Sequence, residues 1–275
     1  MASEGKLRVL AVGAHPDDCD LKAGGTAALY ASLGHEVLFL SLTNGDTGHH
    51  EIGGGQLARK RHAEASAAAA LAGIQYRCFD IHSGELVPSV EYRRMLIQLI
   101  REYAPNLVMT HRPNDYHPDH RYGSQLLQDA MYLVTVPNNT PLTPHLSFNP
   151  VVMYFSDDFR QPTAFTPDVV VGIDSTMEKK IDMLDCHVSQ MYEWLPYNRG
   201  QIDHVPSDAK ARREWLGEAQ RAEAGALADR YREAACTLYG PERGKAIRYA
   251  EAYGICEYGG RLSPETIPVY FPFFK

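Results

Sequence analysis

The sequence lacks the features of several large classes of protein. No apolar stretch approaches the ~20 residues that a membrane-spanning helix needs, and residues 1–6 contain no apolar segment of a secretory signal. The five cysteines are scattered and form no CxxC pair, which favours reduced thiols over a disulfide framework. A net charge of −7 argues against non-specific nucleic-acid binding. We therefore expect a cytoplasmic protein without a membrane or nucleic-acid partner.

Two nucleotide-binding signatures are absent as well. After the first apolar run, Gly13 is followed by Ala14, His15 and Pro16, so the G-x-G-x-x-G turn of a dinucleotide site is missing. The pair Gly24-Gly25 comes too late to replace that turn, and the sequence contains no P-loop. A nucleotide-binding function is therefore disfavoured.

What the sequence does contain is an alternation of apolar runs and helical patterns. The predicted strands are Leu7–Val12, Val37–Leu42, Gln75–Phe79, Leu107–Thr110, Val151–Phe155 and Val169–Ile173. The predicted helices are Gly24–Leu33, Gln56–Ala72, Tyr92–Tyr103, Tyr122–Val134, Met177–His187 and Asp208–Leu238. This order predicts an α/β fold, a Rossmann-like and mostly parallel sheet with helices on both faces and a helical C-terminal extension. No repeat or clean boundary divides the chain, so we expect one domain over 1–275, with a core at about 7–190 and the extension at about 191–275.

Two short strings of imidazole and carboxylate groups follow predicted strands. Ala14-His15-Pro16-Asp17-Asp18 comes after Leu7–Val12, and His117-Pro118-Asp119-His120 comes after Leu107–Thr110 and a short loop. In an open α/β sheet, ligands bind at that edge. His15 and Asp18 can converge on one ion, and His120 can supply a third ligand from the other loop. Two imidazoles and one carboxylate suit one Zn²⁺ per chain with an open position for water, and the same set can hold Fe²⁺ or Co²⁺.

The remaining polar residues of the two strings can carry the chemistry. Asp17 stands next to Asp18 and can accept a proton from water as a general base. Asp119 can hold the second ring nitrogen of a ligand histidine. His117, when protonated, can stabilise an oxyanion or protonate a leaving amine. The structural alternative for Asp17 and His117 is a helix cap or an ordinary hydrogen bond.

The two strings together resemble the LmbE-like (PIG-L) family of zinc-dependent N-acetylglucosaminyl deacetylases. The likeness runs from roughly Leu7 to Gln190, and further matches are Thr43-Asn44-Gly45-Asp46, Arg61-His62-Ala63-Glu64-Ala65 and His187-Val188-Ser189-Gln190. The resemblance implies a hydrolase that removes the N-acetyl group from an N-acetylglucosamine-type sugar or its glycoside. A small amino-sugar substrate and a homo-oligomer are the partners that we expect.

The resemblance also implies roles for single residues. His15, Asp18 and His120 become the metal ligands, Asp17 the general base and His117 the oxyanion stabiliser or general acid. Arg61 then faces the substrate sugar, and His187 is a substrate-binding residue of the pocket. Asp20 stands where the family often has Glu, and we expect Asp20 and Asp119 to support the ligands from behind.

Three other functions stay open at this point. The same motifs occur in amidases of this family that act on thiol-sugar conjugates. A two-metal phosphoesterase needs two ions ~3.5–4 Å apart, for which Asp46, His49 and His50 are the candidate extra ligands. A non-catalytic sugar-binding or scaffold protein can keep a metal for stability, but Asp17, adjacent to a metal with an open position, argues for catalysis.

Overall fold

The computed structural model describes residues 5–274, so the first residues, on which the predicted absence of a secretory signal rests, lie partly outside it. The strands are β1 (Arg8–Gly13), β2 (Glu36–Ser41), β3 (Gln75–Cys78), β4 (Leu107–Thr110), β5 (Val151–Phe155), β6 (Val169–Gly172) and β7 (Ala250–Ile255). The helices of the first two-thirds are α1 (Asp18–Ser32), α2 (Gly54–Ala72), α3 (Val90–Tyr103), α4 (Pro118–Leu133) and α5 (Met177–Asp185). They are followed by η1 (Ser189–Trp194), α6 (Leu195–Asn198), η2 (Ile202–His204), α7 (Ala209–Arg230), α8 (Arg232–Tyr239), α9 (Pro241–Ala246) and α10 (Ile267–Tyr270).

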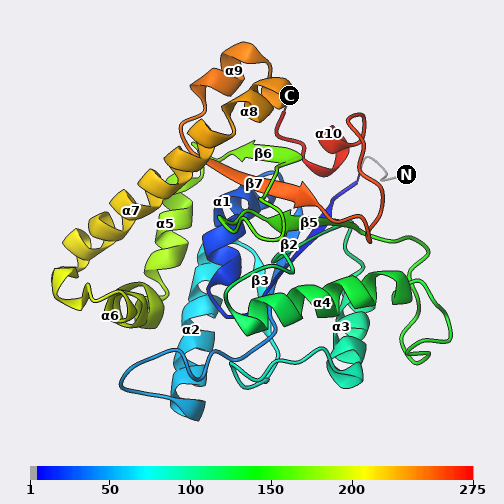
Figure 1. Cartoon of the computed structure of the whole chain (residues 1–275), viewed down its shortest axis with the longest axis horizontal. Coiled ribbons are helices and arrows are strands. Elements are labelled where there is room, and N and C mark those ends of the chain that lie inside the picture. Colours follow the sequence, from blue (N-terminus) through cyan, green and yellow to red (C-terminus); the bar gives the residue numbers. More distant parts are fainter. Residues whose placement is uncertain (1–4, 275) are drawn as a thin grey trace.

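The seven strands form one mostly parallel sheet in the order β3-β2-β1-β4-β5-β7-β6 (Figure 1). Neighbours from β3 to β5 are parallel, whereas β7 runs antiparallel to both β5 and β6. The chain moves outward from β1 to β3 and then returns to place β4 on the other side of β1. This reversal of strand order beside β1 is the place where open α/β sheets bind their ligands.

Helices cover both faces of the sheet, as the sequence predicts. Along β1, Val9 and Ala11 belong to a core with α1, α2 and α5, and Leu10 and Val12 belong to a second core with α3 and α4. Because successive strand residues point to opposite faces, one buried strand serves both cores. The predicted α/β class is therefore confirmed.

The C-terminal extension contains helices, as predicted, and also a strand that the sequence analysis missed. Strand β7 lies between β5 and β6, so the extension completes the sheet. Its sequence, AEAYGI, carries a charged residue and a glycine where a central strand is usually apolar. The charged residue, Glu251, is only 2% exposed and is compensated by Lys180 of α5 at 2.8 Å.

Helices α1 and α4 begin earlier than predicted, and both begin inside the two polar strings. Helix α1 starts at Asp18 rather than Gly24, and α4 starts at Pro118 rather than Tyr122. Proline is favourable at the first position of a helix, because the backbone N–H that it lacks would have no acceptor within the helix there. His117 is the N-cap residue of α4. Both strings therefore lie at strand-to-helix turns, which fixes their side chains on regular structure.

Candidate metal centre

The two strings meet because β1 and β4 are parallel neighbours. Val12 is paired with Thr110, so the segments that follow these strands leave the sheet side by side. The turn after β1 is tight: a Cβ atom on Gly13 would lie 2.7 Å from the Cβ of Asp18. Glycine at this position lets the start of α1 fold back against the end of its own strand.

The three predicted ligands lie within reach of one another, and Asp18 turns a different oxygen toward each histidine. His15 Nδ1 lies 3.2 Å from His120 Nε2, and these two nitrogens lie 3.5 Å from Oδ2 and Oδ1 of Asp18, respectively. Donors bound to Zn²⁺ at ~2.0–2.1 Å in a tetrahedron are separated by about 3.3–3.4 Å. The donor set therefore fits one tetrahedral ion, with the fourth corner left for water or substrate.

Asp18 is held in place by the turn itself. Its Oδ2 accepts hydrogen bonds from the backbone N–H groups of Ala14 at 2.9 Å and His15 at 2.7 Å. Burial would raise the pKa of the Asp18 carboxyl, but the neighbouring His120 and His111 hold it well below its ordinary value. Asp18 is thus an ionised carboxylate aimed at the two imidazoles.

Both histidines that are predicted as ligands have a carboxylate at their second ring nitrogen. Asp119 Oδ2 lies 3.2 Å from His15 Nε2, as predicted, and also accepts a hydrogen bond from the backbone N–H of Gly84 at 2.7 Å. Asp115 Oδ2 lies 3.1 Å from His120 Nδ1. The sequence analysis missed Asp115. Burial opposes protonation of His120, yet Asp18 and Asp115 raise its pKa to about 10, so a metal must displace a proton to bind there.

A further histidine that the sequence analysis missed borders the same point. His111 is buried, and its Nε2 lies 3.2 Å from Asp18 Oδ2. Its ring stacks on that of His120 with centroids 4.0 Å apart. Two groups of donors within 4.8 Å of one another are present, one of His15, His117 and His120 and the other of Asp18, His111 and His120. The sequence feature that could have identified His111 is its position directly after the predicted strand Leu107–Thr110.

Asp17 is paired with Arg61, which changes the role predicted for the arginine. Arg61 Nη2 donates to Asp17 Oδ1 at 2.6 Å, and Nη1 donates to the carbonyl of Gly45 at 3.2 Å. Gly45 has φ +75°, and a Cβ there would lie 2.7 Å from Nη1. Arg61 still lines the cavity, but its main contacts are with the predicted base and the loop after β2 rather than with open space for a sugar.

His117 presents one nitrogen to the cavity. Its Nδ1 accepts a hydrogen bond from the backbone N–H of Asp119 at 3.2 Å, so a neutral ring carries its proton on Nε2. Burial, with the nearby charges of His15 and His120, lowers the pKa of His117 to about 4. The predicted protonated form is therefore disfavoured, and His117 is a neutral donor through Nε2–H.

His187 and Asp20 do not lie where the sequence analysis expects them. Both are almost completely buried and pair with each other, with His187 Nε2 3.3 Å from Asp20 Oδ2. Neither residue lines the cavity, and the partner of Asp20 is not a predicted ligand. His187 therefore lies behind the site in this structure, where it can act on a substrate only through its neighbours.

The candidate extra ligands of a two-metal phosphoesterase are engaged elsewhere. Asp46 pairs with His82 at 2.5 Å, His49 pairs with Glu193 at 2.9 Å, and His50 stacks on Tyr197 at 3.9 Å. Within residues 5–274, none of the three predicted extra ligands belongs to a group of donors that could hold a metal. These three residues therefore do not provide the second metal site that this alternative requires.

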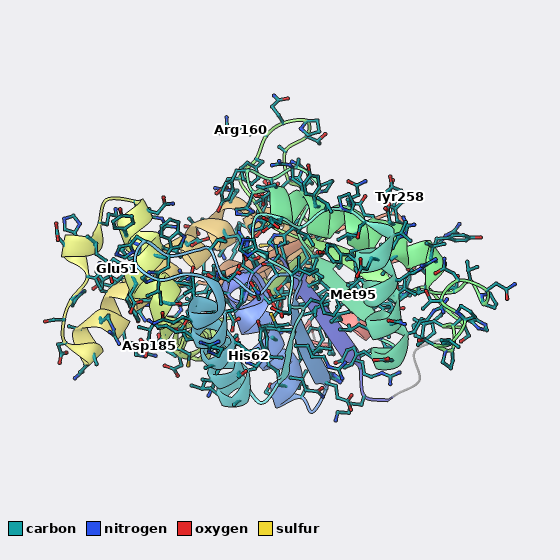
Figure 2. The ribbon with its side chains drawn as sticks, turned by 90° about the horizontal axis from the view of Figure 1, so that it is seen from below. Glu51, His62, Met95, Arg160, Asp185 and Tyr258 are labelled. Carbon is teal, nitrogen blue, oxygen red and sulfur yellow. The ribbon has the colours of Figure 1, made fainter. Side chains whose placement is uncertain are left out.

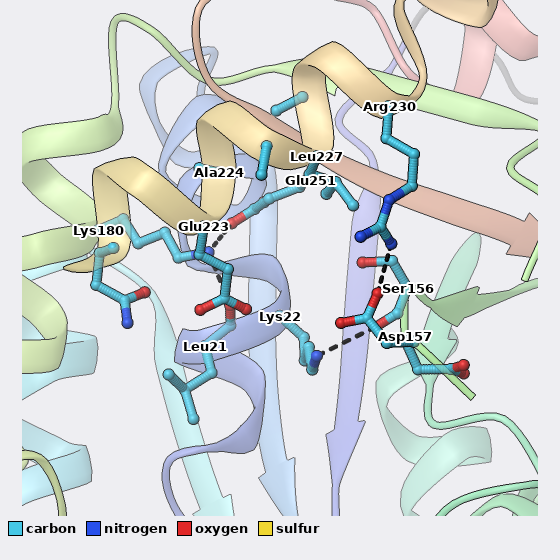
Figure 3. A pocket seen from close by; sticks show the side chains of 14 residues that line it. Leu21, Lys22, Ser156, Asp157, Lys180, Glu223, Ala224, Leu227, Arg230 and Glu251 are labelled. Carbon is cyan, nitrogen blue, oxygen red and sulfur yellow. Dashed lines mark hydrogen bonds and ion pairs between the residues drawn. The ribbon is translucent and has the colours of Figure 1, made fainter.

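The predicted ligands, Asp17, Arg61 and His117 all line one cavity of about 590 Å³. The loop after β5 contributes Asp157 and Phe159 to its wall, while the neighbouring Arg160 stands away from the body of the molecule (Figure 2). A smaller cavity of about 170 Å³ shares Lys22 and Asp157 with the first (Figure 3). The side chains of the two polar strings therefore share one cavity with residues of α7.

Comparisons with known proteins identify the family. The model of the PIG-L family, described as GlcNAc-PI de-N-acetylase, matches residues 10–131. Diacetylchitobiose deacetylase of Thermococcus kodakarensis is 31% identical over 209 residues, which cover 70% of this chain and 75% of that protein. The chain belongs to the PIG-L (LmbE-like) family. The resemblance that the two strings suggest is thus confirmed.

This PIG-L chain is also similar to a protein named for another reaction. The 4-oxalmesaconate hydratase of Pseudomonas putida is 27% identical over 198 residues, 69% of this chain and 76% of that protein. The solved structure of N,N'-diacetylchitobiose deacetylase from Pyrococcus horikoshii matches 93% of this chain and 85% of its own with a TM-score of 0.69 and 23% identity, which shows a common fold. None of the helices in residues 5–274 has the length and apolar character to cross a membrane.

Proposed function

We propose that this chain is a zinc-dependent N-deacetylase, which hydrolyses the N-acetyl group of an N-acetylglucosamine-type sugar or its glycoside. The observation that carries the proposal is the convergence of His15, Asp18 and His120 within 3.5 Å, in a cavity that also contains Asp17 and His117. The similarity to a diacetylchitobiose deacetylase supports an acetamide as the reacting group.

His15, Asp18 and His120 would hold the ion, and Asp119 and Asp115 would keep the two imidazoles in position. When bound, zinc supplies a Lewis acid for the amide carbonyl and lowers the pKa of water. Every other part of the proposed reaction belongs to side chains of the cavity.

Asp17 accepts the proton of the water that attacks the amide carbon, and it later returns this proton to the departing amine. Its Oδ1 is occupied by Arg61 at 2.6 Å, which leaves Oδ2 for the proton. His117 donates from Nε2–H to the carbonyl oxygen as negative charge develops on it, because Nδ1 is already engaged by the backbone. Water thus adds to carbon, the carbon–nitrogen bond breaks, and acetate and an amine leave.

A hydratase is the competing function, because the relative from Pseudomonas putida covers a similar share of the chain. The side chains of the cavity alone carry an excess of negative charge. Six acidic residues line it against three basic ones: Asp17, Asp18, Asp115, Asp157, Asp158 and Glu223 against Lys22, Arg61 and Arg199. The two positive charges of a bound Zn²⁺ would offset most of this excess, so the higher identity to the diacetylchitobiose deacetylase, 31% against 27%, is what favours the amide.

The test is an amine-release assay on the zinc-loaded chain with N-acetylglucosamine, N,N'-diacetylchitobiose and an N-acylated thiol-sugar conjugate. A parallel assay follows the ultraviolet absorbance of 4-carboxy-2-hydroxymuconate, the compound for which a solved hydratase from Pseudomonas putida of the same fold is named. We expect amine from an N-acetyl sugar, loss of activity with a chelator and recovery with zinc. Amine release from the thiol conjugate alone would assign the chain to amidases that act on thiol-sugar conjugates. Hydration of the muconate without amine release would overturn the proposal. Asp17→Asn is the control for background hydrolysis.

A further inference from the structure

The wall of the cavity that faces the polar strings comes from the part of the chain beyond the region matched by the family model. Residues of η1, α6 and α7 line it, and most of them are apolar, among them Met191, Leu195 and Leu216. On α7, Trp215, Ala219 and Glu223 recur at every fourth residue, so one face of this helix borders the cavity. The C-terminal third of the chain therefore shapes the space available to a substrate.

Both tryptophans of the chain lie in this wall. The sequence contains two, Trp194 and Trp215, and each is half-buried and lines the cavity. Within residues 5–274, neither indole N–H donates a hydrogen bond to the protein. A tryptophan that serves only the core usually buries its ring and finds a partner for its N–H. Trp215 packs on one side against the apolar cluster around Leu184 and Leu216, and both indoles also line the cavity.

Each indole is supported from behind by a tyrosine. The ring of Trp194 stacks on Tyr197 with centroids 6.1 Å apart, and Trp215 packs at a tilt against Tyr192 at 6.4 Å. Trp194 is also the last residue of η1, a π-helix, and such helices are rare and often occur at functional sites. A surface that is held in place before a ligand arrives loses little entropy when it binds one.

Trp194 lies close to the reactive end of the cavity. A Cβ atom on Gly48 would be 3.7 Å from the indole nitrogen of Trp194 and 3.3 Å from Nη1 of Arg61. Arg61 in turn holds the proposed base, Asp17, at 2.6 Å. A ligand with its acetamide at Asp17 and His117 would therefore extend past Arg61 toward the indoles.

We propose that Trp194 and Trp215 form a subsite for the second sugar ring of a neutral N-acetylated disaccharide or longer glycan. The C–H faces of that ring pack on the indoles, and the indole N–H groups donate to its hydroxyls. A cavity of about 590 Å³ is of the size that encloses a drug-sized ligand, which exceeds a single hexosamine ring. This inference rests on the proposed deacetylase function, and it narrows the substrate from amino sugars in general to glycosides with a carbohydrate aglycone.

Because both tryptophans line one cavity, intrinsic fluorescence reports its occupancy without any turnover. The first experiment titrates zinc-loaded Asp17→Asn protein with N,N'-diacetylchitobiose or N-acetylglucosamine. We expect the disaccharide to change the emission and to bind at least 10-fold more tightly than the monosaccharide. Equal affinity for the two sugars, or no change in emission with either, would overturn the subsite. Since this arm uses no substitution of a tryptophan, it does not depend on how such variants fold.

The second experiment compares kcat/KM for the two sugars in Trp194→Leu, Trp215→Leu and a control, Tyr258→Leu. Tyr258 is an exposed aromatic residue that lines a separate cavity, to which neither tryptophan belongs. We expect the preference for the disaccharide to fall about 10-fold in each tryptophan variant and to stay unchanged in the control. A preference that survives both substitutions would refute the subsite. A wild-type chain that prefers an aryl N-acetylglucosaminide to the disaccharide would also refute it, because the wall would then select an apolar aglycone.

The two proposals can fail separately. Amine release with no contribution from the tryptophans would leave the deacetylase function standing and remove the subsite. Tight binding of the disaccharide to the zinc-loaded wild-type chain without amine release would support the subsite and refute the deacetylase function.

Discussion

The contact between β7 and α1 allows a prediction with a magnitude. The Glu251 carboxylate accepts hydrogen bonds from the backbone N–H groups of Gly25 at 3.0 Å and Thr26 at 2.8 Å, both within α1. Lys180 donates to the same carboxylate at 2.8 Å and to the carbonyl of Leu21 at 2.7 Å (Figure 3). Both charged side chains are at least nine-tenths buried. This ion pair therefore joins the C-terminal strand to the helix whose first turn carries Asp18.

The substitution Glu251→Gln removes the negative charge and leaves the ammonium of Lys180 buried without compensation. Removal of one partner from a buried ion pair costs about 3–5 kcal/mol. The two backbone N–H groups of α1 also exchange a charged acceptor for a neutral one, which weakens those hydrogen bonds. We expect the free energy of unfolding to fall by about 4 kcal/mol, which corresponds to a decrease in Tm of roughly 10 °C in a chain of this size.

The assay is urea denaturation followed by circular dichroism, with the same saturating zinc concentration for every variant. In a double-mutant cycle with Lys180→Met, the double variant should be more stable than the sum of the single losses predicts, by about 2 kcal/mol, because no unpaired charge remains. The control is Lys6→Gln, which breaks an exposed pair with Glu36 and should cost less than about 1 kcal/mol. A loss below about 1 kcal/mol for Glu251→Gln, or strictly additive losses, would refute this account of β7.

Three further predictions concern the metal centre. Asp17→Asn should retain zinc while kcat falls roughly 10²–10⁴-fold; loss of the metal from the folded variant, by elemental analysis, would give Asp17 a ligand role instead. His117→Ala should also retain zinc and lose about 3–4 kcal/mol of transition-state stabilisation with little change in KM, and a change confined to KM would contradict the donor role. Asp115→Asn should weaken zinc binding about 10–100-fold in competition with a chelator, and unchanged affinity would show that His120 needs no partner.

The sequence predicts best what depends on short-range pattern. Six of the seven strands are predicted, and all of these except β3 (QYRC) lie in apolar runs. The two polar strings stand out because imidazoles and carboxylates follow such runs. The pairing of Asp119 with His15 is also foreseeable, since a histidine that binds metal through one nitrogen needs a partner for the other. These predictions use the chemistry of neighbouring residues in the chain.

Contacts between distant segments are the ones that the sequence hides. Strand β7 is missed because Glu251 interrupts its apolar run, and the lysine that compensates it lies 71 residues away on α5. Asp115 is missed for a similar reason, because no pattern in the neighbouring sequence shows that its carboxylate contacts Nδ1 of His120. The signal for His111 was stronger, since it follows a predicted strand directly, as the first string does.

The predicted metal donors and the wall with the two tryptophans also differ in how well the sequence predicts them. The metal donors converge because β1 and β4 are parallel neighbours, and parallel strands bring the residues after their carboxyl ends to one edge of the sheet. No such rule applies to the proposed substrate wall. Trp194 and Trp215 lie on separate helices and line the same cavity as the predicted metal donors because α5 packs against α7. A sequence motif can therefore indicate the reaction of this chain, whereas the choice of substrate depends on long-range packing and becomes visible only in the folded structure.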